Sequence, residues 1–418
     1  MGNTFGCCLV EEEECYSSLL IEAPKAVKAC RNFERHPLLW GCTTEEEESA
    51  EIARVLQSIK HRHGREGLHT AGFEYRLEAC SLHHPPADNE DACDIVEEKK
   101  FALQEEEDIT ERERCEKCCT RLHHTASNTR IEDTNRSLFI VDGDMYDEIC
   151  RLCQEVAQEF MQKEANLKWI TLCEDDAHDV PLRALVHRDY RKEEEAKSQQ
   201  PTLLIATGNG KVCAGIFSRK HLLTSGMEPS TALPMLREAK KRGMRSALIT
   251  PNARGKYYTM NTFQKSLSAL FTSSSIIQQQ PRKQNPIYVV AHSASGGYLT
   301  RHLLTSPQLL PRIQAIAFTD STHNIQWTKH NPTLQSKLQD SSSLYLRSND
   351  VRSLGGKEPP KQTGSKADTD SFWRHRFGSI RTLWAGTNDH SLMHWSAHDV
   401  IWGHFDRHCA SSSRCKHQ

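Results

Sequence analysis

The sequence lacks the features that mark membrane-spanning, secreted and nucleic-acid-binding proteins. It has no run of 18 or more apolar residues, as a membrane-spanning helix needs, and no apolar segment of a secretory signal follows its start. Its 53 Lys and Arg nearly balance its 55 Asp and Glu, whereas proteins that bind nucleic acid through charge carry a strong basic excess. We therefore expect an intracellular protein that does not bind nucleic acid directly.

The 16 cysteines lack the setting of a disulfide framework, because they are spread over 418 residues rather than a short secreted chain. Reduced thiols are the default in such a chain. Cys115, Cys118 and Cys119, with His123 and His124, have a spacing that suits zinc. The second ligand pair that such sites use is missing, so a solvated segment is the favoured interpretation. We expect no metal and no other cofactor.

The first eight residues, MGNTFGCC, contain candidate sites for lipid attachment. Gly2 is a candidate for myristoylation, and Cys7 and Cys8 for palmitoylation; stable membrane anchoring needs two chains. Against this, position six is Gly6 instead of Ser or Thr, and Glu11–Glu14 would be repelled by an anionic leaflet. Two hypotheses stay open: an acylated start that holds the protein on the cytoplasmic face of a membrane, or an unmodified disordered start.

Residues 1–135 form an acidic extension in which runs of glutamate alternate with short apolar pieces. Charge blocks of this kind are usually solvated, so we expect the extension to be largely disordered, with a helix around residues 50–60. The pattern changes near residue 137. A helix beginning at Asp144 is predicted by apolar residues at three- and four-residue steps: Met145, Ile149, Leu152, Val156 and Phe160.

From there, short apolar runs alternate with helical patterns, which predicts an α/β domain over residues 137–408 with a mostly parallel sheet covered by helices on both faces. A surface insertion is expected at 355–371 and a tail at 409–418. The predicted strands are 169–173, 185–187, 203–207, 247–250, 287–290, 313–319, 344–347 and 382–385.

The stretch AHSASGG, residues 291–297, lies between a predicted strand and a predicted helix. A serine at such a turn is how hydrolases present a nucleophile, and small residues two places before and after it are required. Sterics allow either Ser293 or Ser295. The strand ends at Val290, which puts Ser293 on the turn and Ser295 in the helix, so Ser293 is the favoured candidate. The alternative is a serine-rich helix start with no catalytic role.

Other strand ends supply candidate partners for this serine. Gly208 and Asn209 follow an earlier strand, where backbone N–H groups, together with that of Ala294, could stabilise an oxyanion. Asp320 and Asp350 follow the next two strands, and either could orient a histidine. His390 follows the last strand and is the candidate base. The order serine, aspartate, histidine is typical of the α/β-hydrolase fold.

Six collinear stretches resemble the argonaute-binding-protein-two (Arb-two) domain family, which includes animal cotranscriptional regulators. They are MYDEICRLCQEVAQEFMQKEANLKWI, LLIATGNGKVCAGIFSRKHLL, SALITPN, VVAHSASGG, IQAIAFTDSTHN and AGTNDHSLMHW. The resemblance implies an α/β-hydrolase-like fold and carries the family's motif residues onto Ser293, Asp320 and His390. The turn departs from the family's pattern, because Ala294-Ser295 stands where one residue would precede the double glycine.

The resemblance implies a role in argonaute-dependent silencing, heterochromatin or splicing regulation, exerted through protein partners in the cytoplasm or nucleus. The leading hypothesis is therefore an interaction protein built on a hydrolase fold. The alternative is a serine hydrolase, an esterase or thioesterase with a small ester substrate. The sequence leaves open whether the protein is an enzyme.

Overall fold

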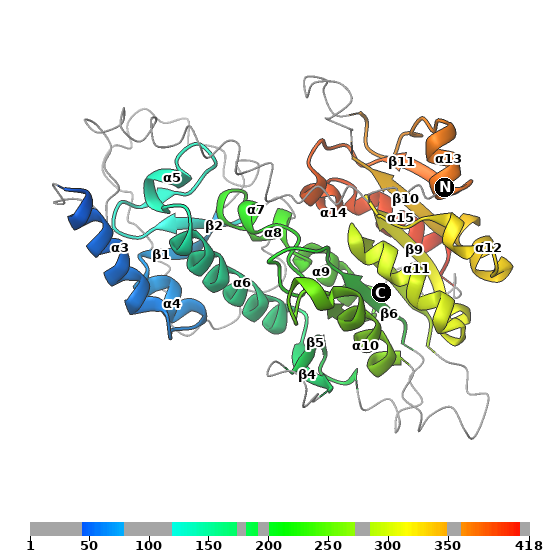
Figure 1. The fold of residues 1–418 in the computed structure, drawn as a ribbon, viewed down its shortest axis with the longest axis horizontal. Coiled ribbons are helices and arrows are strands. Elements are labelled where there is room, and N and C mark those ends of the chain that lie inside the picture. Colours follow the sequence, from blue (N-terminus) through cyan, green and yellow to red (C-terminus); the bar gives the residue numbers. More distant parts are fainter. Residues whose placement is uncertain are drawn as a thin grey trace, which may run out of the picture.

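The computed structural model describes residues 44–78, 119–173, 181–190, 200–271, 285–348 and 361–409. Its centre is an eight-stranded sheet with the order β11-β10-β9-β8-β6-β7-β5-β4 (Figure 1). The strands are β4 (Leu167–Cys173), β5 (Leu182–His187), β6 (Thr202–Ala206), β7 (Arg245–Ile249), β8 (Ile287–His292), β9 (Ile313–Thr319), β10 (Ser343–Arg347) and β11 (Arg381–Trp384). All eight predicted strands are present.

The sheet is mostly parallel: only β5 runs against its neighbours β4 and β7. Counted along the chain from β4, the order across the sheet is first, second, fourth, third, fifth, sixth, seventh and eighth. This is the strand order of α/β hydrolases, so the predicted fold class is confirmed. In a parallel sheet the loops at the carboxyl ends of the strands form the usual functional edge, and here β6, β8, β9, β10 and β11 end on it together.

Helices cover both faces of this sheet. One face packs against α6 (Asp144–Glu164), α7 (Arg219–Thr224), α8 (Met227–Ser230), α9 (Leu233–Lys241), α14 (Met393–Ser396) and α15 (His398–Arg407). The other packs against α10 (Thr259–Phe271), α11 (Ala294–Thr305), α12 (Pro332–Gln339) and α13 (Ser371–Phe377). Short 3-10 helices lie in the connections: η3 (Lys256–Tyr258), η4 (Pro307–Arg312), η5 (Ile325–Thr328) and η6 (His390–Leu392).

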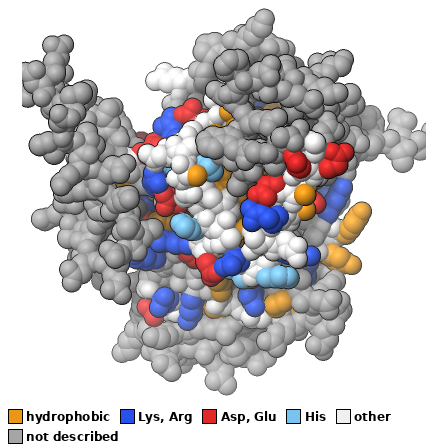
Figure 2. Space-filling model, turned by 90° about the vertical axis from the view of Figure 1, so that its left-hand side faces the viewer, with side chains coloured by type: hydrophobic (Ala, Val, Ile, Leu, Met, Phe, Trp, Pro, Cys, Tyr) orange, Lys and Arg blue, Asp and Glu red, His pale blue; other side chains and the backbone are white. Residues whose placement is uncertain are grey.

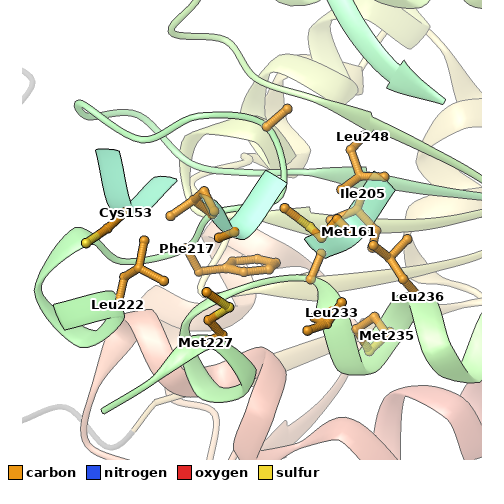
Figure 3. Packing of buried hydrophobic residues seen from close by; sticks show 14 of the residues in the cluster. Cys153, Met161, Ile205, Phe217, Leu222, Met227, Leu233, Met235, Leu236 and Leu248 are labelled. Atoms are coloured by element: carbon orange, nitrogen blue, oxygen red, sulfur yellow. The ribbon is translucent and has the colours of Figure 1, made fainter. Parts of the chain in front are cut away.

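Alternate strand residues supply the two cores, because successive side chains of a strand point to opposite faces. Ile205 of β6 belongs to the core under α6, and Leu204 to the core under α11. Figure 3 shows the first core, where Met161 of α6 and Leu236 of α9 lie over Ile205 and Leu248 of the sheet. A side chain at Gly215 would not fit beneath α6, since its Cβ would lie 2.8 Å from Met161 Sδ.

Part of the acidic extension is folded, which corrects the expectation of disorder for residues 44–78 and 119–135. These residues form α3 (Glu45–Ile59), α4 (Gly64–Thr70) and a small sheet of β1 (Phe73–Glu78), β2 (Cys119–His124) and β3 (Thr129–Arg130), followed by α5 (Arg136–Phe139). We call residues 44–78 and 119–135 the N-terminal module. It shares the core of α6, with Phe73 and Leu122 fully buried.

The prediction of disorder was wrong for the run Glu45–Glu48, because these residues form the first turn of α3. Thr44 accepts a hydrogen bond from the Glu47 N–H, and the Glu47 side chain accepts one from the Thr44 N–H. Such a capping box and negative charge at a helix start both stabilise a helix. The expected solvated Cys/His segment is corrected for its described part: Cys119, His123 and His124 lie in β2, and His124 is buried against Phe73. Cys115 and Cys118 lie outside the described residues.

No described helix combines the length and apolar character needed to cross a lipid bilayer. Over the face with the N-terminal module, basic and acidic side chains of the described residues are intermixed (Figure 2). Ion pairs of the N-terminal module and α6 include Arg151 with Glu148 and Glu155, and Arg130 with Glu78. The described part of this face therefore forms no patch of a single charge.

Candidate active site

Ser293 lies in the turn between β8 and α11, with φ 53° and ψ −125°. A residue other than glycine is strained in this region and stays there only when its surroundings hold it. The holding contacts come from the end of β9. The Ser293 N–H donates to the Thr319 carbonyl (2.9 Å), and the Ser293 carbonyl accepts from the Thr322 N–H (3.1 Å). This is the backbone geometry of a nucleophile elbow.

Ser295, the competing serine, lies in the first turn of α11 and is fully buried. Its hydroxyl donates to the carbonyl of Thr207 at the end of β6, so it serves to hold the neighbouring loop. Ser293 is partly exposed instead. Compared with the Arb-two pattern, this stretch contains one additional residue before the double glycine. The residues after Ser293 belong to α11, and Ser293 itself has the positive φ of an elbow serine.

The double glycine fits α11 against the loop after β9. A Cβ on Gly296 would lie 1.9 Å from Ser321 Oγ, and one on Gly297 would lie 2.8 Å from Thr322 Oγ1. Both distances are shorter than real Cβ contacts, so only glycine allows this approach. The close packing keeps the helix start beside the loop that carries Asp320.

Asp320 and His390 meet, with Asp320 Oδ2 3.0 Å from His390 Nδ1. Two further bonds hold the carboxylate: Oδ1 accepts the Ser348 N–H (3.0 Å), and Oδ2 accepts the Ser348 hydroxyl. A carboxylate at Nδ1 favours the tautomer with the proton there and leaves Nε2 as a base. Asp320 also has a positive φ of 43°, while its N–H is bonded to the Leu346 carbonyl (3.0 Å).

The alternative acid, Asp350, lies outside the described residues, as do Gly2, Cys7 and Cys8. Ser348, at the end of β10, supports the carboxylate from the neighbouring strand. Sequence reasoning missed this role of Ser348. The available signal was a hydroxyl residue at the strand end where α/β hydrolases usually place their acid.

His292 connects the elbow to His390. It directly precedes Ser293, and its ring lies 4.5 Å from the His390 ring, measured between centroids. Burial, with His390 and His394 nearby, holds the pKa of His292 well below its ordinary value. The ring is therefore neutral, and its Nδ1 lies 3.0 Å from Thr319 Oγ1. An uncharged neighbour leaves His390 free to accept a proton without like-charge repulsion from that side.

Gly208 touches the elbow from the loop after β6. A Cβ there would lie 3.0 Å from Ser293 Cβ and 3.5 Å from Ser293 Oγ. Asn252 holds the loop, since its amide nitrogen donates to the Gly208 carbonyl (2.9 Å) and its amide oxygen accepts the Gly210 N–H (3.2 Å). The Asn209 side chain bonds to the Tyr298 hydroxyl (2.8 Å). The loop is thus fixed beside the serine.

The predicted oxyanion donors are the backbone N–H groups of Gly208, Asn209 and Ala294. The N–H groups of Asn209 and Ala294 donate to no atom of the described residues. Ala294 begins α11, and the first N–H groups of a helix have no carbonyl one turn earlier. The structure therefore brings Ser293, Asp320, His390 and the Gly208–Asn209 loop to one edge of the sheet. No group of three or more described His, Cys, Asp or Glu is arranged to hold a metal ion.

No protein-family model matches the sequence. A cotranscriptional regulator ARB2A homolog of Gallus gallus is 19% identical over 298 residues, which cover 59% of this chain and 67% of the relative. A FAM172 family protein homolog of Caenorhabditis elegans is 26% identical over 199 residues, 48% of this chain; the match spans only 57% of the worm protein. The chain is similar in sequence to both.

Solved structures with a similar fold include a histone deacetylase from Saccharomyces cerevisiae, at 14% identity and a TM-score of 0.38, covering 61% of this chain and 96% of that one. A hyperthermophilic esterase from the archaeon Pyrobaculum calidifontis is 11% identical with a TM-score of 0.33, covering 62% and 89%. The assignment of the fold rests on the strand order described above.

Proposed function

We propose that the protein is a serine hydrolase that cleaves an ester or thioester. Two observations support the proposal: Ser293 lies in a strained turn, and His390, whose ring lies 4.5 Å from that of the preceding residue His292, is bonded to the Asp320 carboxylate. Serine, aspartate and histidine follow one another in the order that α/β hydrolases use. A turn that only caps a helix has no need of a left-handed serine, because glycine adopts that conformation without strain. The conformation of Ser293 therefore favours a serine hydrolase, which the sequence analysis gave as the alternative to an interaction protein.

In this mechanism Ser293 Oγ attacks the acyl carbon while His390 Nε2 takes the hydroxyl proton. Asp320 stabilises the imidazolium, and the Asn209 and Ala294 N–H groups bind the negative oxygen. The leaving alcohol or thiol takes the proton from His390, which leaves an acyl group on Ser293. Water then attacks the acyl carbon, gives a proton to His390, and releases the acid as Ser293 recovers its proton.

The test is labelling with a fluorophosphonate probe, which reacts with activated serines. We expect the folded protein to take up one probe per chain and Ser293→Ala to take up none. Ser295→Ala is the matched control: it loses a buried hydrogen bond, at about 1 kcal/mol of stability, and keeps its labelling. Absence of labelling in the folded protein, or labelling that survives Ser293→Ala, would contradict the proposal.

A second candidate function is regulation through protein contacts, supported by the name of the chicken relative. In this role the hydrolase fold is an interaction scaffold in the nucleus or cytoplasm, with chromatin or argonaute complexes as partners. Affinity purification of the wild-type protein and of Ser293→Ala from its own cells separates the two functions. Partners that bind both forms equally support the scaffold, and absence of any chromatin or argonaute component removes its support.

A further inference from the structure

A second histidine and carboxylate pair lies directly beside His390. Asp389 precedes His390 in the chain, and its Oδ2 is 2.7 Å from His221 Nε2 on α7. Its Oδ1 accepts the Ser391 N–H (2.8 Å), which caps η6. The other ring nitrogen of His221, Nδ1, is 2.8 Å from Ser225 Oγ. Both oxygens of Asp389 are thus engaged by groups other than His390.

Only 13% of the His221 side chain is exposed, whereas 41% of the Asp389 side chain is. Burial alone would raise the pKa of Asp389, but the hydrogen bond and charge of His221, the Ser391 N–H and the nearby His390 hold it below its ordinary value. Asp389 is therefore ionised at neutral pH. A carboxylate in this position competes with Asp320 for the His390 imidazole unless another group holds it.

The geometry points to His221 as a positioning residue for His390: it keeps the Asp389 carboxylate turned away, so that Asp320 alone of these two carboxylates holds Nδ1. The inference rests on the proposed function, in which His390 Nε2 is the base. His221 does not touch the reacting atoms. It acts through the loop that carries His390.

The N-terminal module fixes α7, the helix that carries His221. The Tyr75 hydroxyl of β1 donates to the Leu222 carbonyl (2.9 Å), and the Arg121 guanidinium of β2 donates to the Ser225 carbonyl. Both acceptors lie within four residues of His221. The module thereby contributes to the placement of a side chain at the functional edge of the large sheet.

Loss of His221 removes the partner of Asp389 Oδ2, so that the carboxylate beside His390 keeps only the Ser391 N–H. Among the described residues, the other titratable groups facing His390 include Asp320 on β9 and His292 on β8, which is neutral, with His394 on α14 near His292. None of these changes when His221 is replaced. A negative charge nearby favours the protonated imidazole, so the pKa of His390 rises in the variant. The base is then protonated over more of the neutral range.

The experiment compares His221→Gln, Asp389→Asn and the double variant with the wild-type chain. The readouts are the pH dependence of the fluorophosphonate labelling rate and the NMR titration of the His390 ring. For His221→Gln we expect the His390 midpoint to rise by about 0.5 to 1 pH unit, and labelling at pH 7 to fall by about 1.5-fold to threefold for a wild-type midpoint near the ordinary value of about 6.5. The double variant, which also removes the charge, should return to the wild-type midpoint.

A merely structural role for His221 would lower the labelling rate equally at every pH and would not be rescued by Asp389→Asn. That result, or an unchanged midpoint in His221→Gln, overturns the inference. His398→Gln is the matched control, because His398 also pairs with an aspartate, Asp399 (3.1 Å), but on the surface of α15. If the wild-type chain takes no probe, the proposed function fails. The NMR titration of the same variants then decides the inference alone.

Discussion

In both sheets of the molecule, residues other than glycine take a positive φ, for different reasons. In the small sheet, Asn128 takes a φ of 55° in the turn between β2 and β3; asparagine adopts this conformation readily in turns. At the edge of the large sheet, Ser293 and Asp320 take φ values of 53° and 43°. Serine does not favour this region, and contacts from β9 and β10 hold both residues there. The first case is local turn chemistry, and the second is imposed by tertiary structure.

Buried polar groups differ between the two regions as well. The N-terminal module is anchored to α7 and α8 by conventional bonds, such as that from the Thr120 N–H to the buried Glu228 carboxylate (2.7 Å). The module also buries one imidazole, that of His124, whereas several are buried near the edge of the large sheet, among them His292 and His323. Anchors of the first kind stabilise the fold at any neutral pH. Buried imidazoles make stability depend on pH.

Removing the anchor of the module should have the largest effect on stability. Glu228 is 1% exposed and also accepts a bond from Arg237 (3.2 Å). Glu228→Ala leaves the Thr120 N–H without its acceptor and one charge partly uncompensated, so we expect a loss of about 3 kcal/mol in urea unfolding. Glu51→Ala, which breaks an exposed pair with Arg54, is the control and should change nothing measurable. Equal stability of the two variants would show that the module is not held by Glu228.

The second prediction concerns pH. Burial, with Arg376 nearby, lowers the pKa of His323 to about 3, against about 6.5 in an unfolded chain. Since the unfolded state binds the proton first, this group contributes stability above pH 6.5, and the contribution is lost as the pH falls towards 3. His323→Gln should therefore flatten the fall in unfolding free energy by about 1.4 kcal/mol per pH unit between pH 6 and 4. His61→Gln, an exposed histidine, should leave the slope as it is; an unchanged slope in His323→Gln as well would contradict the assignment.

The smallest effect is expected at the contact between the module and α7. Tyr75→Phe removes the hydroxyl that donates to the Leu222 carbonyl, which should cost about 1 kcal/mol in urea unfolding. Tyr257→Phe changes a residue that is 89% exposed and serves as the control. If Tyr75→Phe also slows labelling at Ser293, the N-terminal module and the candidate active site are coupled through α7. If neither the unfolding free energy nor the labelling rate changes, this contact does not couple the two regions.

Strand-helix alternation predicted the large sheet well, because its strands are continuous apolar runs buried on both faces. The order of Ser293, Asp320 and His390 was likewise visible, since each follows a strand. The small sheet was not predicted: β1 and β2 are separated by 40 residues and carry charged side chains on one face. Tertiary pairing also sets where α9 begins: Thr231 pairs with Ile216 in an isolated bridge, and the helix begins at Leu233.

Contacts between distant residues account for what sequence patterns could not supply at the site. His221 and Asp389 are 168 positions apart, and no periodicity relates them. The choice between the two aspartates likewise depends on the bond from Asp320 to His390, and the support from Ser348 depends on the pairing of β9 with β10. Local patterns predict elements; partners across the sheet follow only from the assembled fold.

The left-handed serine has an evolutionary consequence. Glycine adopts a φ of 53° without strain, so a chain selected for folding alone would gain on the order of 1 kcal/mol by exchanging Ser293 for glycine. Random substitution therefore erodes this side chain in any lineage that no longer uses its hydroxyl. Under the proposed function, a change of this serine to glycine in an orthologue would mark a lineage that no longer uses the hydroxyl.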